Sequence, residues 1–354
     1  MYDITARFVL WLKECNAMRA KRAWRWLGFL AGPVVLIVLA IYFFLISPPS
    51  SSPPERVVIA TLIQPSSGLI IVAAENGFFQ DNGLDAVYQT HSLGVHALQA
   101  VLNGKADIAV AADIPFMFAV MKGGDIAIFA TIYKSRRDLA LMTMSDRGIA
   151  APKDLVGKTI GATFGTNLQF FLDAMLMANG IPEEKVTIVD LKPSELVNAL
   201  QTGKADAVTV FPPYMEELQG IFGSRAVIFF GEDLYTSRYN LIAKRDYLKK
   251  HPDTARKVLM ALREAEQYAK KNPPQAYEII GRHLKLKAHD VAEMFESGAF
   301  ELTLEQSLLL TLDEETRWAM KRGFVKMAPV PNYLDYLNVD PLLAADPEAV
   351  KIIH

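Results

Sequence analysis

Two similar twelve-residue segments, identical at Gly-Lys-Ala-Asp, constrain the fold of this chain more than any other feature. "LNGKADIAVAAD" begins at Leu102 and "QTGKADAVTVFP" begins at Gln201, and both contain Gly-Lys-Ala-Asp. Apolar residues recur at helical spacing before each copy, and a β-rich apolar run follows it. Gly104 and Gly203 stand where a helix favours a left-handed cap. Each copy is therefore predicted to be a helix that leads into a strand.

Strands and helices are predicted to alternate from Arg56 onward. "RVVIATL", "LDAVYQT", "KTIGATF" and "KVTIVDL" have the composition of buried strands, and helical patterns separate them. Such alternation is typical of mostly parallel sheets with helices on both faces. Because the unit is repeated, we predict an α/β protein with two lobes. Lobe I takes about residues 56–143 plus 236–354, where "YNLIAKRDYL" is a returning strand, and lobe II takes about residues 144–235.

The N-terminal residues predict a membrane anchor. Residues 26–46 contain no charged side chain over 21 positions, which is long enough for a helix to cross a bilayer. Six basic residues precede this run and the next one is Arg56, so the N-terminus is expected on the cytoplasmic side. We predict a cytoplasmic segment at 1–25, a single transmembrane helix at 26–46, a Pro/Ser linker at 47–55 and a domain at 56–354 outside the plasma (inner) membrane. A cleaved signal peptide is the alternative, although no small-x-small cleavage site follows the run.

Composition excludes several classes of function. The 37 basic and 39 acidic residues are mixed along the chain and give a net charge of −2, so no nucleic-acid partner is expected. Cys15 is the single cysteine, which excludes an internal disulfide and a multi-cysteine metal site. The histidines are scattered, and no nucleophile elbow, phosphate loop or dinucleotide fingerprint occurs. We therefore expect no catalytic residues, no metal, no cofactor and no enzymatic activity.

The ligand site is expected at the carboxyl ends of the strands. Parallel sheets bind ligands beyond these ends, whereas Gly-Lys-Ala-Asp lies at the amino ends, so its residues are predicted to form turns. The loops in question are "QPSSG", "HSLG", "ADIPF", "FGTN" and "FPPYM". They supply the candidate ligand-binding residues Gln64, Ser66, Ser67, Ser92, Asp113, Gly165, Thr166, Asn167, Phe211 and Tyr214.

The chemistry of these loops favours an anionic group. Gly165, Thr166 and Asn167 stand at the amino end of a predicted helix, where free N–H donors and the helix dipole attract negative charge. Thr166 or Asn167 could equally be a helix cap. Asp113 has the same two alternatives, a contact to a ligand amine or a cap. Phe211 and the nearby Tyr214 either stack on a ligand or belong to the core.

Several motifs together resemble a known family. "AAENGFFQDNGLD", "PKDLVGKTIGATFGT", "LKPSELVNALQTGKADAV" and "FPPY" resemble, in this order, motifs of ABC-transporter solute-binding proteins of the nitrate, sulfonate and taurine type, which include pyrimidine-precursor binders. The resemblance implies a two-lobed periplasmic-binding-protein fold of type II that closes on a small solute, with an ABC permease and ATPase as partners. Two features depart from the family: the predicted anchor, and Phe211-Pro212-Pro213 where Trp-Glu-Pro is common, which removes a carboxylate.

Three functions are compatible with this resemblance. The first is a membrane-tethered binding component that captures a small anionic or heterocyclic solute and delivers it to an ABC importer. The second is an extracytoplasmic sensor that uses the same site and reports to another membrane protein. The third is a biosynthetic enzyme on the same fold, although the cysteine-rich motif of pyrimidine synthases is absent.

Overall fold

The apolar runs of the chain form two larger β-sheets in a computed structural model, which describes residues 53–353. The predicted cytoplasmic segment at 1–25, the anchor at 26–46 and most of the linker lie outside the described residues. Within residues 53–353 no helix is both long enough and apolar enough to cross a membrane. Pro54–His354 is one compact unit, and both sheets belong to it.

The first sheet, which defines lobe I, has six strands in the order β11-β4-β10-β3-β1-β2. Its strands are β1 (Glu55–Leu62), β2 (Leu84–His91), β3 (Ile108–Ala112), β4 (Ile126–Ser135), β10 (Ser237–Lys244) and β11 (Gly298–Ala299). The second sheet, which defines lobe II, has five strands in the order β7-β6-β8-β5-β9. Its strands are β5 (Ala140–Met144), β6 (Thr159–Ala162), β7 (Thr187–Asp190), β8 (Ala207–Val210) and β9 (Ala226–Phe230). A two-stranded ladder joins β12 (Leu304–Glu305) and β13 (Val350–Lys351).

Each larger sheet contains a strand that is antiparallel to both of its neighbours. β1 pairs in parallel with β2 and β3, whereas β10 is antiparallel to both β3 and β4. In lobe II, β6 pairs in parallel with β7 and β8, whereas β5 is antiparallel to both β8 and β9. β5 and β10 are the strands that follow a passage from the other lobe. They enter their sheet from the side where the parallel strands end, and they therefore run the opposite way.

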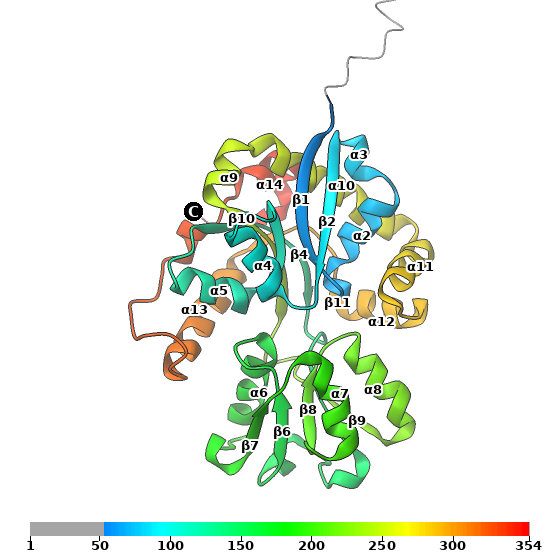
Figure 1. Ribbon diagram of the computed structural model, residues 1–354, viewed down its shortest axis with the longest axis vertical. Helices are drawn as coiled ribbons and strands as arrows, with labels where there is room; N and C mark the ends of the chain where they lie inside the picture. The colour runs from blue at the N-terminus through cyan, green and yellow to red at the C-terminus, as the bar shows by residue number, and fades with distance from the viewer. Residues whose placement is uncertain (1–52, 354) are drawn as a thin grey trace, which may run out of the picture. The chain divides into compact units, whose positions relative to one another are not determined.

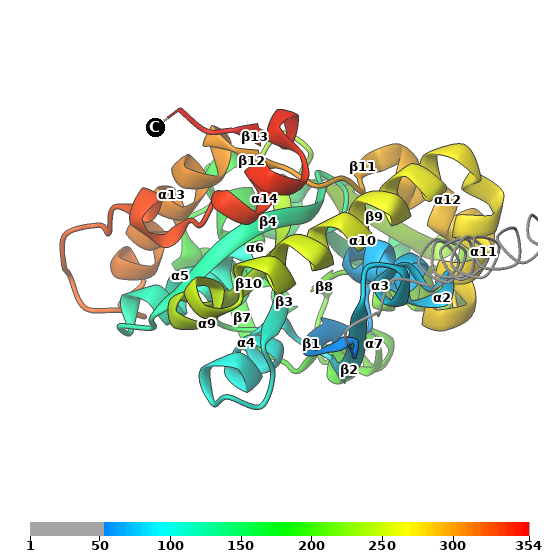
Figure 2. The same ribbon diagram turned by 90° about the horizontal axis from the view of Figure 1, so that it is seen from above.

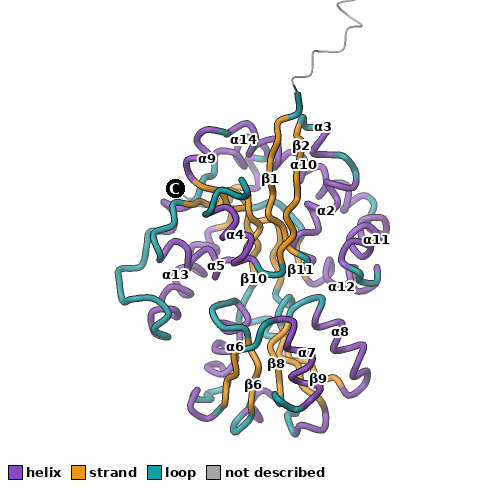
Figure 3. The backbone as a smooth tube through the Cα atoms, in the orientation of Figure 1, coloured by secondary structure: helices purple, strands orange, loops and turns teal. Residues whose placement is uncertain are grey.

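Helices cover both faces of the sheets, as Figures 1 and 3 show. Lobe I carries α2 (Gly68–Glu75), α3 (Phe78–Asp81), α4 (Gly94–Leu102), α5 (Asp113–Met121), α9 (Arg245–Lys250), α10 (Pro252–Lys271), α11 (Pro273–Leu284), α12 (Ala288–Ser297), α13 (Gln306–Lys321) and α14 (Asp340–Ala345). Lobe II carries α6 (Asn167–Ala178), α7 (Pro193–Thr202) and α8 (Tyr214–Phe222). Figure 2 shows the long α10 running past α2, α3 and α14, so the C-terminal part of the chain completes lobe I.

The repeated Gly-Lys-Ala-Asp segment has the same structural role in both lobes. The Asp107 carboxylate accepts a hydrogen bond from the Val58 N–H at 2.8 Å, and the Asp206 carboxylate accepts one from the Thr159 N–H at 2.9 Å. In both cases the backbone N–H of the aspartate donates back to the same neighbouring residue. Each aspartate thus fixes the start of its strand against a neighbouring parallel strand, β1 in lobe I and β6 in lobe II. Lys105 is exposed, as expected for a turn residue.

Two connections join the lobes, and they are hydrogen-bonded to each other. One leads from β4 to β5 and contains Asp138, and the other leads from β9 to β10 and ends at Ser237. The Ser237 hydroxyl donates to the Asp138 carboxylate at 3.1 Å, and the Tyr133 hydroxyl contacts the same carboxylate at 3.4 Å. All three residues are buried. The pair of connections therefore has the construction of a hinge.

Candidate ligand-binding site between the lobes

A small cavity lies where the carboxyl ends of strands from both lobes meet. Its volume is about 20 Å³, which is room for one water molecule. It is lined by Gln64, Leu93, Gly94, Val95, Ala112, Pro115, Thr166, Asn167, Phe211 and Tyr239. These residues follow β1, β2, β3, β6 and β8 or lie on β10. The lobes are thus closed here, and a solute reaches this cavity only if they separate.

Four of the predicted site residues line this cavity: Gln64, Thr166, Asn167 and Phe211. Thr166 caps α6, because its hydroxyl oxygen accepts a hydrogen bond from the Leu168 N–H at 3.2 Å. Asn167 begins α6 and is buried, with the amide nitrogen near the Tyr239 hydroxyl but outside hydrogen-bonding geometry with any group of the described residues. The N-terminus of α6 thus holds an unpartnered donor at the cavity.

Ser66 and Ser67 are both buried beside this site, with different roles. The Ser67 hydroxyl oxygen accepts hydrogen bonds from the Leu62 N–H at 3.0 Å and the Thr61 hydroxyl at 2.7 Å. It therefore fixes the turn after β1. The Ser66 hydroxyl has no hydrogen-bond partner within residues 53–353. An unpaired buried polar group is costly, so Ser66 is a second buried group with unused hydrogen-bonding capacity.

Besides Ser66 and Ser67, four further predicted residues do not line the cavity. The side chain of Ser92 is exposed, and its carbonyl accepts a hydrogen bond from the Gln64 amide at 3.3 Å. The Gly165 N–H donates to the Gln169 side chain at 2.8 Å and is therefore already satisfied. Tyr214 lies on α8 with its ring edge against Phe211, at 5.4 Å between ring centroids. These three residues support neighbours of the cavity.

Asp113, the fourth, is fully buried beneath α5. Its carboxylate accepts a hydrogen bond from the Tyr235 hydroxyl, and the fully buried Glu315 of α13 lies beside it. Burial raises the pKa of both carboxyls, and Arg238 opposes the shift. Asp113 therefore joins α5, α13 and the hinge.

Tyr239 is the cavity residue with a polar side chain that sequence reasoning missed. Its hydroxyl donates to the Gln64 side chain at 3.0 Å, and burial raises its pKa well above the ordinary value, so it remains a donor. Tyr239 pairs with Ala112 in the antiparallel β3–β10 ladder. An antiparallel strand begins where its parallel neighbours end, so the first residues of β10 lie at the site. The sequence "SRYNLIAK" predicts a strand, but the position of Tyr239 at the site follows only from the antiparallel direction of that strand.

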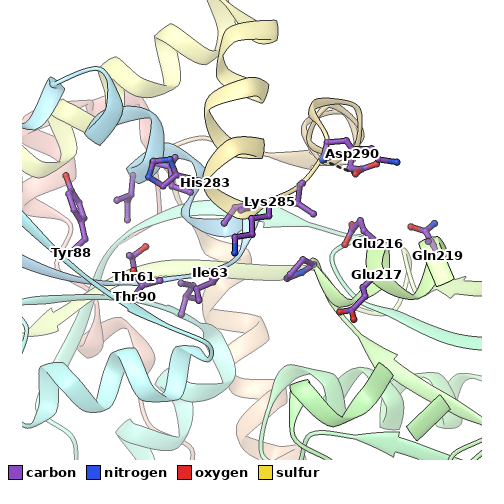
Figure 4. A pocket seen from close by; sticks show the side chains of 18 of the residues that line it. Thr61, Ile63, Tyr88, Thr90, Glu216, Glu217, Gln219, His283, Lys285 and Asp290 are labelled. Carbon is purple, nitrogen blue, oxygen red and sulfur yellow. Dashed lines mark hydrogen bonds between the residues drawn. The ribbon is translucent and has the colours of Figure 1, made fainter. Parts of the chain in front are cut away.

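Two larger cavities adjoin this site, and the Phe211-Pro212-Pro213 turn borders all three. Pro213 lines a groove of about 1090 Å³, shown in Figure 4, whose other walls come from α2, α8 and the residues around the α11–α12 connection. Pro212 lines a polar cavity of about 630 Å³ that is also lined by Arg136 and Arg137 of the β4–β5 connection. No group of histidine, cysteine, aspartate or glutamate suited to hold a metal occurs in residues 53–353.

A band of contacts also ties lobe I to lobe II beside the cavity. Asp173, on α6, accepts hydrogen bonds at 2.6 Å from the Trp318 indole and from Arg322 Nε, which lie on α13 and directly after it. Arg322 also pairs with Glu183 of lobe II. The Trp318 ring meets Phe170 of α6 edge-on at 5.3 Å. The helix whose N-terminus faces the cavity is thus held directly by lobe I.

The chain is similar to several known binding proteins. It is 23% identical over 254 residues to the taurine-binding periplasmic protein of Escherichia coli, covering 68% of this chain and 77% of that one. The fold matches the periplasmic aliphatic sulphonate-binding protein SsuA of E. coli, with a TM-score of 0.71, 18% identity, and 80% and 97% of the two chains covered. It also matches the nitrate-binding protein NrtA of Synechocystis, with a TM-score of 0.63, 14% identity, and 83% and 89% covered. The two-lobed periplasmic-binding-protein fold that the resemblance implied is confirmed.

A family model described as "NMT1/THI5 like" matches residues 64–276, which run from Gln64 at the cavity through lobe II to the helices that complete lobe I. The matched segment contains both copies of the repeated phrase and every candidate site residue. The chain therefore belongs to the NMT1/THI5-like family.

Proposed function

We propose that this protein is an extracytoplasmic solute-binding protein that captures a small anionic solute between its lobes and delivers it to an ABC importer. The observation that carries the proposal is the pair of unpartnered buried polar groups at the closed interface, Ser66 Oγ and Asn167 Nδ2. Asn167 is at the N-terminus of α6, where the helix dipole favours a negative charge. Relatives named for taurine, sulfonate and nitrate binding support an anion of this kind.

Capture is proposed to work by lobe closure about the two hydrogen-bonded connections. The space of about 20 Å³ between the lobes holds one water molecule, so the lobes are proposed to separate to admit the solute and then to close on it. Of the predicted set, Gln64, Ser66, Thr166 and Asn167 are proposed as direct polar contacts for this step, and Tyr239 is added to them. The chain is proposed to act by binding alone. Lobe II is proposed to begin with β5 at Ala140, a few residues before the predicted boundary at about 144.

A thermal-shift screen tests this function. The full-length protein is heated with nitrate, taurine, methanesulfonate or a pyrimidine precursor, and a ligand present at 100 times its dissociation constant adds about 2.7 kcal/mol of stability. We expect at least one of the anions to raise the melting temperature. A screen in which only neutral pyrimidines bind would contradict the anionic assignment.

Residues 26–46 are proposed to keep the protein in the plasma membrane, with the binding domain outside. Their length without charge and the basic residues before them support this topology. The mature protein should then retain its first 50 residues and sediment with membranes. N-terminal sequencing that begins near Ser51 would instead establish a cleaved signal peptide.

A further inference from the structure

Two buried carboxyl groups, those of Asp113 and Glu315, lie side by side between α5 and α13. Both side chains are fully buried, and they are within reach of a hydrogen bond to each other. Asp113 Oδ1 accepts hydrogen bonds from the Tyr235 hydroxyl and from the Ile114 N–H, the latter at 3.1 Å. Within residues 53–353, no donor reaches Asp113 Oδ2 or either oxygen of Glu315. A proton on one of the two carboxyl groups would supply the missing donor.

Arg238 supplies the positive charge that faces this pair. The titratable groups around the pair are Arg238 and Tyr239 of β10, Tyr235 and Asp138 of the two connections, Glu314 of α13, Tyr333, and Glu305 of β12, which faces Arg238. The Arg238 guanidinium is buried and donates to neutral oxygens of Thr236, Thr311 and Ser307, at 3.1, 3.0 and 3.2 Å. One positive charge balances one carboxylate, so the second carboxyl group is expected to be neutral, because an unpaired buried charge is costly. Burial raises the pKa of Glu315 well above its ordinary value, in agreement with a protonated carboxyl group at neutral pH.

Asp113 belongs to the contact between the lobes. Ala112 and Pro115, on either side of it in the chain, line the small cavity. The Tyr235 hydroxyl donates to Asp113, whereas the Tyr235 ring packs in the core of lobe II and meets Phe170 of α6 edge-on at 5.3 Å. This hydrogen bond therefore links a carboxyl group of lobe I to a ring held in lobe II. Separation of the lobes is expected to change this contact and to admit water beside Asp113.

Glu315 lies under the contact that α13 makes with lobe II. It precedes Trp318 by three residues, so the two side chains share a face of the helix. The Trp318 ring meets the same Phe170 at 5.3 Å, and the Trp318 indole donates to Asp173 at 2.6 Å. When the lobes separate, α6 is expected to withdraw from this turn of α13, and Glu315 gains access to water. The surroundings that favour a neutral carboxyl group are thus expected to be complete only in the closed form.

We propose that capture of the solute is coupled to the uptake of one proton, which Asp113 and Glu315 share in the closed form and release to water when the lobes separate. This inference rests on the proposed function and adds a condition for closure. No covalent bond between heavy atoms changes, because the proton comes from the solvent on closure and returns to it on opening. Since the closed form holds the proton more tightly, affinity is highest below the pKa of the pair in the open form. It falls by up to about tenfold per pH unit as pH rises towards the pKa of the pair in the closed form.

The number of protons taken up on binding tests this coupling. Methanesulfonate, which stays ionised over the pH range used, is titrated calorimetrically into the full-length protein in lipid nanodiscs, with empty nanodiscs as the reference. Tris and triethanolamine are the buffers, because they differ in heat of ionisation and add no sulfonate or phosphate. We expect uptake of at least about half a proton per bound solute at about pH 7.5, and a loss of affinity of about threefold to tenfold between about pH 7.5 and about pH 8.5. Nitrate replaces methanesulfonate if it is the anion that the thermal-shift screen identifies.

Two variants separate this pair from other acidic groups. Glu315→Gln keeps the shape of the side chain and offers an N–H donor to Asp113, so it should bind without proton uptake and change affinity less than about twofold over the same pH range. Glu314→Gln is the matched control, since Glu314 is the adjacent residue, is exposed and undergoes the same substitution. It should retain the proton uptake of the wild type. In infrared difference spectra, a band of a protonated carboxyl group should appear on binding in the wild type and in Glu314→Gln, but not in Glu315→Gln.

The outcomes distinguish the coupling from the proposed function. Binding of methanesulfonate or nitrate with no proton uptake overturns the coupling and leaves the proposed function standing. Proton uptake that persists in Glu315→Gln, or that Glu314→Gln loses equally, overturns the assignment to this pair. The proton count and the infrared band of the wild type test the coupling even if Glu315→Gln does not fold. Failure of every anion to bind, here and in the thermal-shift screen, overturns the proposed function and the coupling with it.

Discussion

The contact between Arg322 and lobe II predicts that a single substitution far from the cavity weakens ligand binding. Arg322 reaches the Asp173 carboxylate through Nε at 2.6 Å and also pairs with Glu183. The side chains of Arg322 and Asp173 are only 17% and 12% exposed. Burial alone would lower the pKa of Arg322, but the hydrogen bonds to the two carboxylates raise it above its ordinary value. This contact therefore stabilises the closed arrangement.

The free energy that closure loses in Arg322→Ala depends on the groups around Asp173. Removal of one partner from a buried ion pair costs about 3–5 kcal/mol, and a hydrogen bond to a charged group is worth about 1.5–3 kcal/mol. In Arg322→Ala, Asp173 keeps its hydrogen bond from Trp318 and gains access to water, so the lower range applies. We expect closure to lose about 2 kcal/mol, which is about thirtyfold in the equilibrium between closed and open forms. The bound form keeps this contact, whereas the free protein exchanges between open and closed forms, so the apparent dissociation constant should rise by up to about thirtyfold.

Calorimetric titration with the tightest solute from the thermal-shift screen measures the affinity, and small-angle scattering measures the radius of the ligand-free protein. Arg317→Ala is the matched control, because Arg317 lies on the same helix, is 66% exposed and pairs only with Asp313 of its own helix among the described residues. The control should change affinity less than about twofold. The reasoning is refuted if Arg322→Ala binds as tightly as the wild type with an unchanged radius, or if both variants lose the same affinity.

The remaining predictions concern the cavity, a strained residue and the hinge. Asn167→Ala should weaken solute binding by about 1–3 kcal/mol in a calorimetric titration, whereas Lys204→Ala, in the exposed turn of the repeated phrase, should leave it unchanged. Lys285 ends α11 with φ of 57°, a left-handed conformation that glycine adopts at no cost, so Lys285→Gly should stabilise the protein by about 0.5–1 kcal/mol in urea unfolding. Burial raises the pKa of Asp138 from 3.8 to about 6, so its contribution to stability is complete below about pH 4 and is lost, by about 3 kcal/mol, as pH rises through about 6. Asp138→Asn should flatten that part of the stability profile between pH 4 and pH 7, and an unchanged profile would show that Asp138 is not the group responsible.

The sequence predicted the architecture well because its signals are local. Helical spacing before each Gly-Lys-Ala-Asp phrase and apolar runs after it identify α4, α7, β3 and β8, and the left-handed glycine caps at Gly104 and Gly203 are confirmed. The placement of the phrase at the amino ends of strands follows from the same pattern. What the local pattern lacks is strand direction. The reversed strands β5 and β10 depend on where the chain returns from the other lobe, which is a property of the whole fold.

The candidate site likewise contains residues that the sequence predicts and residues that it does not. Gln64, Thr166, Asn167 and Phe211 line the cavity because each follows a parallel strand, and that rule can be applied to a sequence. Asp113 satisfies the same rule, yet its side chain pairs with residues more than 100 positions away along the chain. Such partners decide whether a polar side chain points to a ligand or into the core. The apolar groove is equally non-local, since its walls come from four separate segments.

The start of β10 contains both Tyr239, which lines the cavity, and Ser237, which belongs to the hinge. Tyr235, Ser237 and Tyr239 alternate along the chain, so their side chains point to one face where the backbone is extended. Tyr235 donates to Asp113, Ser237 donates to Asp138 in the other connection, and Tyr239 donates to Gln64 at the cavity. Because these three hydrogen bonds lie within five residues, rotation at the hinge changes the position of Tyr239, and a ligand that binds Tyr239 restrains the hinge. Because β10 is antiparallel to β3, the end of the β9–β10 connection lies at the carboxyl ends of the parallel strands. The ligand is expected at these ends.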